Sequence, residues 1–104
     1  MVEKSVLKVA NQFIKQIPKD MGLQSAYLFG SHAKGMADQD SDIDIALIMS
    51  KMDNFFSVQM RLMRLRRNID LRIEPHPIEE KDFTEQNPFA SQIKKSGIQL
   101  NKSS

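Results

Sequence analysis

Two aspartates stand inside an otherwise apolar stretch, shortly after a glycine-serine pair. Asp42 and Asp44 flank Ile43 in SDIDIALIM, and Gly30-Ser31 follows the apolar run SAYLF. Asp is depleted in β-strands, and residues two apart on a strand point to the same face. Paired carboxylates are suited to Mg²⁺, which proteins often hold with one or two carboxylates and substrate phosphates. A helix cap or a solvated loop end is the alternative interpretation.

Gly30 and Ser31 are expected to turn the chain between a strand and a short helix. Glycine lets the backbone approach a ligand closely, and the N-terminus of a helix binds phosphate through its free N–H groups. The Ser31 hydroxyl can add a hydrogen bond. The pair therefore predicts a phosphate-binding turn, with an ordinary turn as the alternative.

A third aspartate, Asp70, lies in the alternating run NIDLRIE. If that run forms a strand beside the one carrying Asp42 and Asp44, three carboxylates crowd one place. Their repulsion is relieved by cations bound between them. Three carboxylates and a phosphate-binding turn favour two-metal transfer at a phosphorus centre. An exposed edge-strand face, with Arg72 neutralising Asp70, is the alternative.

Hydrophobic periodicity predicts the elements that must position these residues. Apolar steps of three and four residues predict helices between residues 2 and 17 and over residues 54–67. Apolar or alternating runs predict strands over residues 25–29, 43–49 and 68–74, the last closed by Pro75 and Pro77. His76, between these prolines, is expected in a loop without function. Short helices are expected after Ser31, in PIEEKDF and in NPFASQIKKSG, which gives an α/β chain of order αβαβαβα.

Composition limits the class of protein. The chain has 104 residues, 40% of them hydrophobic and 27% charged, which predicts one globular domain with residues 101–104 as a frayed tail. It has no cysteine, which excludes disulfides and thiolate metal sites. A signal peptide and a membrane-length apolar run are absent from the sequence, so we expect a cytoplasmic protein without a membrane partner. The net charge of +2 does not indicate a nucleic-acid partner.

The motif G-S-x-x-x-G-x-x-x-x-x-S-D-x-D, running from Gly30 to Asp44, resembles the signature of the DNA polymerase β-like nucleotidyltransferase superfamily. At this length the chain resembles a minimal nucleotidyltransferase (MNT domain). The motifs of the resemblance extend from Leu28 to Ile73, and the order of elements extends it to the whole chain, residues 1–104. It implies a polymerase β palm-like fold, with a small mixed sheet of three to four strands packed by helices.

The resemblance also implies roles for single residues. The catalytic and metal-binding residues would be Asp42, Asp44 and Asp70. The nucleotide-binding residues would be Gly30, Ser31, Lys34 and Ser41. His32 stands where relatives often carry Arg, so Lys34 would supply the positive charge. The implied reaction moves a nucleoside monophosphate, AMP from ATP, to an acceptor hydroxyl with two Mg²⁺ ions.

Minimal members of the superfamily often pair with a helical HEPN-domain toxin, so the resemblance implies an antitoxin that adenylylates its partner. The alternative is a non-catalytic metal- or nucleotide-binding module that neutralises a partner by docking. A transferase acting on a small molecule is a third interpretation, disfavoured because the chain has no room for a substrate domain. The missing acceptor site would come from another chain, a homo-oligomer or the HEPN partner. The arginines between residues 61 and 67 are either a solvated helix face or a docking surface.

Overall fold

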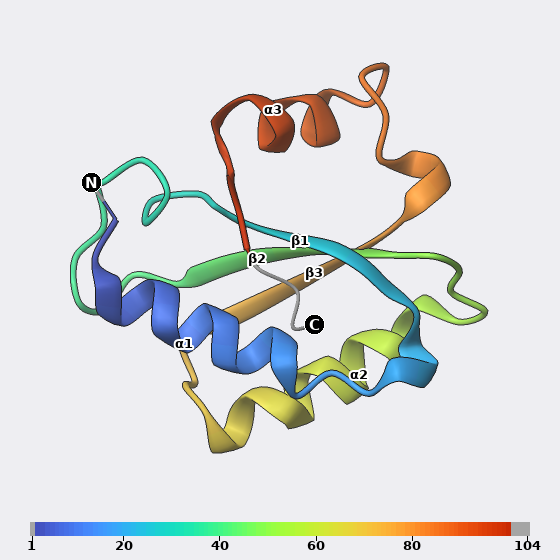
Figure 1. Ribbon diagram of the computed structural model, residues 1–104, viewed down its shortest axis with the longest axis horizontal. Coiled ribbons are helices and arrows are strands. Elements are labelled where there is room, and N and C mark those ends of the chain that lie inside the picture. The colour runs from blue at the N-terminus through green and yellow to red at the C-terminus, as the bar shows by residue number, and fades with distance from the viewer. Residues whose placement is uncertain (1, 101–104) are drawn as a thin grey trace.

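The computed structural model describes residues 2–100, which form a mixed sheet with helices on both faces (Figure 1). The main elements are, in chain order, α1 (Lys4–Lys15), β1 (Leu23–Phe29), β2 (Ile43–Met49), α2 (Phe55–Leu65), β3 (Ile73–Glu79), α3 (Pro88–Ser96) and β4 (Ile98–Gln99). Short 3-10 helices join some of them: η1 (Lys19–Met21), η2 (Arg66–Asn68) and η3 (Glu80–Asp82). The predicted α/β class with a small mixed sheet is confirmed. The tail expected at residues 101–104 lies outside the described residues.

The strands lie in the order β3-β2-β1-β4. β1 is antiparallel to both β2 and β4, whereas β2 and β3 are parallel and α2 forms the crossover between them. The end of β1 therefore meets the start of β2, and β3 starts at the same end of the sheet. Side chains from β1, β2 and β3 meet at this end of the sheet.

The two faces of β2 have different environments. Ile43, Ile45 and Leu47 are fully buried in the core that α1 and α2 cover. On the opposite face, Ala46 and Ile48 pack with α3. Asp44 lies on this second face, one alternation closer to the start of the strand than Ala46, and its side chain stays 24% exposed. The face that carries Asp44 is thus only partly covered.

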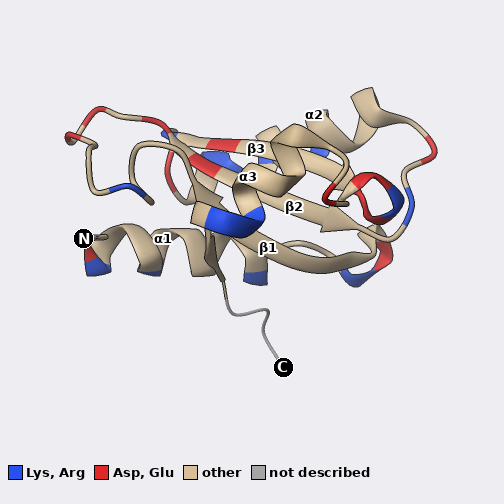
Figure 2. Ribbon diagram, turned by 90° about the horizontal axis from the view of Figure 1, so that it is seen from above, with Lys and Arg blue, Asp and Glu red and all other residues tan. Residues whose placement is uncertain are grey.

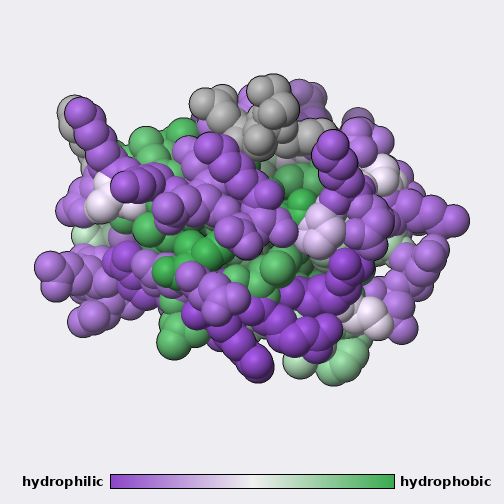
Figure 3. Space-filling view, turned by 60° about the horizontal axis from the view of Figure 1, so that its bottom comes forward, coloured by the Kyte–Doolittle hydropathy of each residue, from purple (hydrophilic) through white to green (hydrophobic). Residues whose placement is uncertain are grey.

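Local signals explain where the helices begin. The side chain of Asn54 accepts a hydrogen bond from the Ser57 backbone N–H at 3.1 Å and caps α2. Asn87 caps α3 in the same way, with Pro88 at the first helical position. The outer face of α1 and α2 is mostly hydrophilic with hydrophobic surface between the polar side chains (Figure 3). Within residues 2–100, each helix is too short or too polar to cross a lipid bilayer.

The third strand differs from its predicted position. β3 runs from Ile73 to Glu79 through both prolines, rather than over residues 68–74. β3 is an edge strand. The carbonyl of Pro75 accepts a hydrogen bond from Nε2 of Gln59, which shows that the Pro75 backbone faces away from β2. A proline whose missing N–H would face outward removes no hydrogen bond from the sheet. Pro75 and Pro77 therefore do not end the strand, and Asp70 lies in a turn before it.

Other local expectations also need correction. Residues 31–35 form successive turns instead of a helix, with the Lys34 N–H bonded to the Gly30 carbonyl at 3.2 Å. Gly30 and Ser31 hence have no helix dipole behind them. Only residues 80–82 of PIEEKDF are helical, because its first residues extend β3. The short strand β4, which pairs with Tyr27 and Leu28 of β1, was not predicted.

Candidate functional site

Gly30 and Asp44 are in direct contact where β1 ends and β2 begins. Phe29 pairs with Asp44 across the two strands. Gly30 has a positive φ of 79°, a conformation that glycine adopts without strain. A Cβ added to Gly30 would collide with Oδ2 of Asp44, so a side chain at position 30 would displace this carboxylate. The glycine-serine turn and Asp44 thus lie together where β1 ends and β2 begins.

Asp44 has a histidine neighbour that the sequence analysis placed in a loop without function. Nε2 of His76 lies 3.0 Å from Oδ1 of Asp44. His76 is in the middle of β3, where it pairs with Ala46, and its ring contacts that of Phe29 edge-on at 5.0 Å between centroids. The signal available in the sequence was the alternation of polar Glu74 and His76 with the apolar residues between them, and the two prolines concealed it.

Glu74 is a second residue that sequence reasoning did not assign to the site. It pairs with Asp44 in the parallel ladder of β2 and β3, so the two side chains leave neighbouring strands on the same face. Acidic residues appear side by side on the two strands in Figure 2. The Glu74 carboxylate is 41% exposed and lies 3.8 Å from Arg66, a long and weak ion pair. The ion pair therefore restrains Glu74 only weakly.

Asp42 is exposed and directly precedes β2, so the paired carboxylates do leave the start of this strand. The Ser41 hydroxyl is used within the loop: it donates to Oδ1 of Asp38 at 3.2 Å and accepts from the Asp38 backbone N–H at 3.1 Å. Ser31 and Lys34 are exposed on the turns after Gly30. Of the predicted nucleotide-binding residues, Gly30 thus contacts Asp44, while Ser41 shapes the loop before Asp42.

Asp70 has a different partner from Asp44, since it is bound by an arginine. Both of its carboxylate oxygens bind Arg72, at 2.8 Å from Nη2 and 3.0 Å from Nε. The same guanidinium donates through Nη1 to the Gln39 carbonyl at 2.8 Å. Arg72 therefore ties Asp70 to the loop that leads into β2.

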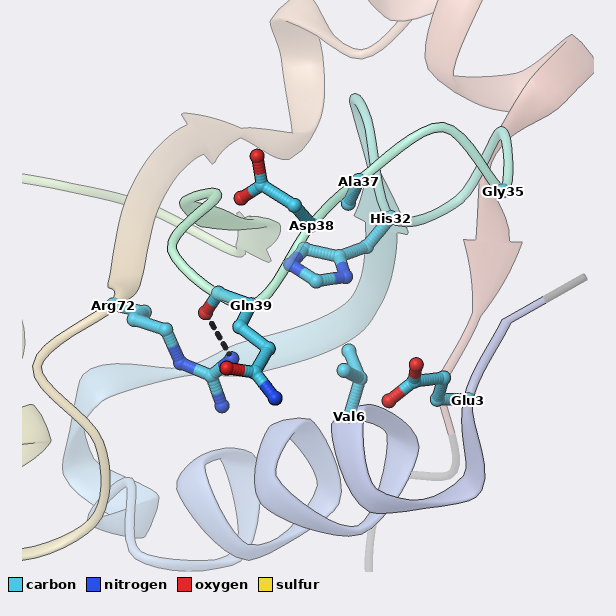
Figure 4. Close-up of a pocket in the computed structure, with 8 residues that line it drawn as sticks. All are labelled: Glu3, Val6, His32, Gly35, Ala37, Asp38, Gln39 and Arg72. Carbon is cyan, nitrogen blue, oxygen red and sulfur yellow. Dashed lines mark hydrogen bonds between the residues drawn. The ribbon is translucent and has the colours of Figure 1, made fainter.

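Figure 4 shows Arg72 and His32 pointing into one pocket, which Glu3 and Val6 close from the side of α1. His32 is buried, with Nε2 3.2 Å from the Ser41 carbonyl. His32 thus fixes the loop before Asp42 from inside. It is not positioned as an exposed substitute for the arginine of the family motif.

The ion pair with Arg72 sets the charge state of Asp70. The hydrogen bonds from Arg72 lower the pKa of the Asp70 carboxyl below its ordinary value, even though burial opposes this shift. The same pair raises the pKa of Arg72. Asp70 is hence ionised and already neutralised by a protein cation, so it has little need of a metal ion.

The donor atoms at the start of β2 fit Mg²⁺. Asp42 and Asp44 present hard carboxylate oxygens, and Gly30 leaves open the space beside Asp44 that a Cβ would fill. In residues 2–100, no three His, Asp or Glu side chains lie close enough together to hold a metal ion alone. Mg²⁺ commonly takes one or two protein carboxylates and completes its shell with water and substrate phosphates. A magnesium site at Asp42 and Asp44 would therefore form together with a phosphate ligand.

Comparison with protein families gives one match. Residues 11–104 match the family described as polymerase beta, nucleotidyltransferase. The match covers most of the chain and includes β1, β2 and β3. A search of curated proteins gives no match.

Several solved structures share the fold. A candidate nucleotidyltransferase from Sulfolobus solfataricus is 25% identical, with a TM-score of 0.65 over 94% of this chain and 81% of that chain. A toxin-antitoxin structure with AMP-PNP is 24% identical, with a TM-score of 0.65 over 93% of this chain and 73% of that chain. A mutant of the toxin-antitoxin MntA-HpeT is 26% identical, with a TM-score of 0.56 over 99% of this chain and 74% of that chain.

Proposed function

Because the chain belongs to the polymerase beta nucleotidyltransferase family, we propose that it transfers AMP from ATP to an acceptor hydroxyl in a Mg²⁺-dependent reaction. The observation that carries this proposal is the contact between Gly30 and Asp44. Gly30, which has no side chain, lies against the Asp44 carboxylate at the start of β2. This is the arrangement expected where a phosphate and a cation meet. The toxin-antitoxin relative with AMP-PNP adds support for an adenine nucleotide.

The residues of the chain have distinct roles in this reaction. Asp42 and Asp44 are the residues that would hold Mg²⁺, whose charge, when bound, neutralises the triphosphate and activates the acceptor. Gly30 and Ser31 present the backbone and a hydroxyl to the phosphates, and Lys34 adds positive charge on the same turns. Glu74 is our choice for the third carboxylate, because it pairs with Asp44 and Asp70 is bound by Arg72.

The chemical step is a substitution at the α-phosphorus. The acceptor oxygen forms a bond to this phosphorus, and the bond from phosphorus to the oxygen bridging toward the β-phosphate breaks. Pyrophosphate leaves with the bonding electrons, and the acceptor proton passes to Glu74. The protein contributes positioning and charge, since it forms no covalent bond to the substrate.

We assign the acceptor to a partner protein, namely a HEPN-type toxin that the AMP group would inactivate. Support comes from the toxin-antitoxin structures among the similar folds. The chain also exposes large apolar side chains that a partner can cover, among them Phe56 at 70% and Leu71 at 68%. A second copy of the chain is the other possible source of an acceptor site.

A second candidate function is neutralisation of the partner by docking alone. The contact between His76 and Asp44 favours it, because a histidine hydrogen-bonded to this carboxylate competes with a cation for the same oxygen. The two candidates differ in one respect. Docking does not need the carboxylate of Asp44, whereas transfer does.

Intact-protein mass spectrometry tests the proposal. The chain is purified with the protein encoded by its neighbouring gene and incubated with ATP and Mg²⁺. We expect a mass gain of one or more AMP units on the partner, lost in Asp44→Asn and kept in Asp53→Asn. Asp53 is a matched control because it is 91% exposed in the loop before α2. A stable complex without an adduct, still neutralising in Asp44→Asn, would establish docking instead.

A further inference from the structure

We propose that the groove between β3 and the first turns of α2 and α3 binds the nucleobase of the nucleotide, an inference that rests on the proposed function. The groove has a volume of about 430 Å³. Its lining includes Phe55, Gln59, Pro75, His76, Pro77 and Phe89. This volume is in the range of small-molecule sites, and the lining is mainly apolar and aromatic with few polar groups, as such sites are.

The groove is continuous with the candidate phosphate and metal site. His76 belongs to both, since its Nε2 lies 3.0 Å from Oδ1 of Asp44 and its ring lines the groove. Glu74 also lines the groove and pairs with Asp44. A nucleotide with its triphosphate at Gly30 and Asp44 can therefore extend its base over His76.

Two phenylalanines of the groove, each in the first turn of a helix, are exposed. Phe55 is 56% exposed and Phe89 is 46% exposed. Phe89 packs edge-on against Phe29 at 5.4 Å between ring centroids. The centroid of the His76 ring lies 6.4 Å from that of Phe89. Its position is thus fixed from one side while part of the ring stays open. A fixed, half-exposed aromatic ring is a stacking platform for a base.

Gln59 supplies the groove with an amide. Its Nε2 donates to the Pro75 carbonyl at 3.2 Å, and its Oε1 is buried without a hydrogen-bond partner among residues 2–100. A buried acceptor without a partner is uncommon. Gln59 therefore brings an amide with an unused acceptor to the wall of the groove.

Calorimetric titrations of the full chain test the inference. The probes are Mg²⁺ complexes of ATP and of tripolyphosphate, which has no base. We expect Phe89→Leu to weaken ATP binding about tenfold, in line with the loss of one stacked base, and to leave tripolyphosphate binding unchanged. Phe89→Tyr keeps the ring and should keep the affinity. Phe56→Ala is the control, because Phe56 is exposed on α2 and does not line the groove.

The results separate this inference from the function on which it rests. If the wild-type chain binds neither ATP nor tripolyphosphate, the proposed function fails and the nucleobase site with it. If both bind and Asp44→Asn weakens both, but Phe89→Leu and Phe55→Ala leave the ATP affinity unchanged, the nucleobase site alone is wrong. Equal affinity for ATP and tripolyphosphate in the wild type would also overturn it. Thermal unfolding of each variant shows whether its fold is kept.

Discussion

Nε2 of His76 lies 3.0 Å from Oδ1 of Asp44, so a histidine of the edge strand holds the carboxylate that we assign to the cation. Both side chains are partly exposed, at 35% and 24%. Groups that hydrogen-bond a metal ligand fix its orientation and tune its affinity. The His76 ring in turn rests edge-on against Phe29. The orientation of Asp44 therefore depends on β1 and β3 as well as on its own strand.

Replacing His76 by alanine should lower the apparent Mg²⁺ affinity in the transfer assay by about tenfold or more, the lower limit for loss of such a partner. The measurement is the transfer rate as a function of Mg²⁺ concentration. Saturating Mg²⁺ should restore most of the rate, since His76 is not assigned to the chemical step. A tighter apparent affinity for Mg²⁺ in the variant would instead show that His76 competes with the cation for Asp44.

Replacing Gly30 by alanine should reduce both stability and transfer. The new Cβ would collide with Oδ2 of Asp44, and the positive φ of 79° costs about 1–2 kcal/mol for a residue with a side chain. Gly35→Ala is the matched control, because Gly35 also has a positive φ, of 71°, and is not assigned to the site. Urea unfolding should show a loss in both variants, whereas transfer should fall at least tenfold only in Gly30→Ala.

The sequence predicted the part of the site that local patterns determine. The limits of β2 and the turn at Gly30 both follow from residues close together in the chain. The limits of β3 do not. Pro75 and Pro77 are strand-ending signals unless the strand lies at an edge of the sheet, and that position depends on the packing of the whole sheet. The same error moved Asp70 into a strand and left His76 and Glu74 outside the predicted site.

Replacing Asp70 by asparagine should destabilise the fold by about 1–2 kcal/mol at neutral pH, as for loss of a charge-assisted hydrogen bond that is partly exposed. Arg72 lowers the pKa of Asp70 in the folded state. The stabilisation is therefore full above the ordinary pKa of 3.8 and is lost as the pH falls through the lowered folded pKa. Urea unfolding of wild type and variant should differ at pH 7 and converge as the pH falls below the lowered pKa of Asp70 in the folded state. An equal difference at both pH values would refute the ion-pair explanation.

The third carboxylate can be identified by comparing Glu74→Gln with Asp70→Asn, two changes that each remove one charge and keep the shape. Glu74 pairs with Asp44 across β2 and β3, and its carboxylate is restrained only by Arg66 at 3.8 Å. Both oxygens of Asp70 are bound by Arg72. We expect Glu74→Gln to reduce the transfer rate about 100-fold or more, as for removal of a general base. Asp70→Asn should reduce it less than tenfold at a temperature where the variant is folded. The reverse order would return the third catalytic position to Asp70, and would imply that Arg72 releases it when the nucleotide binds.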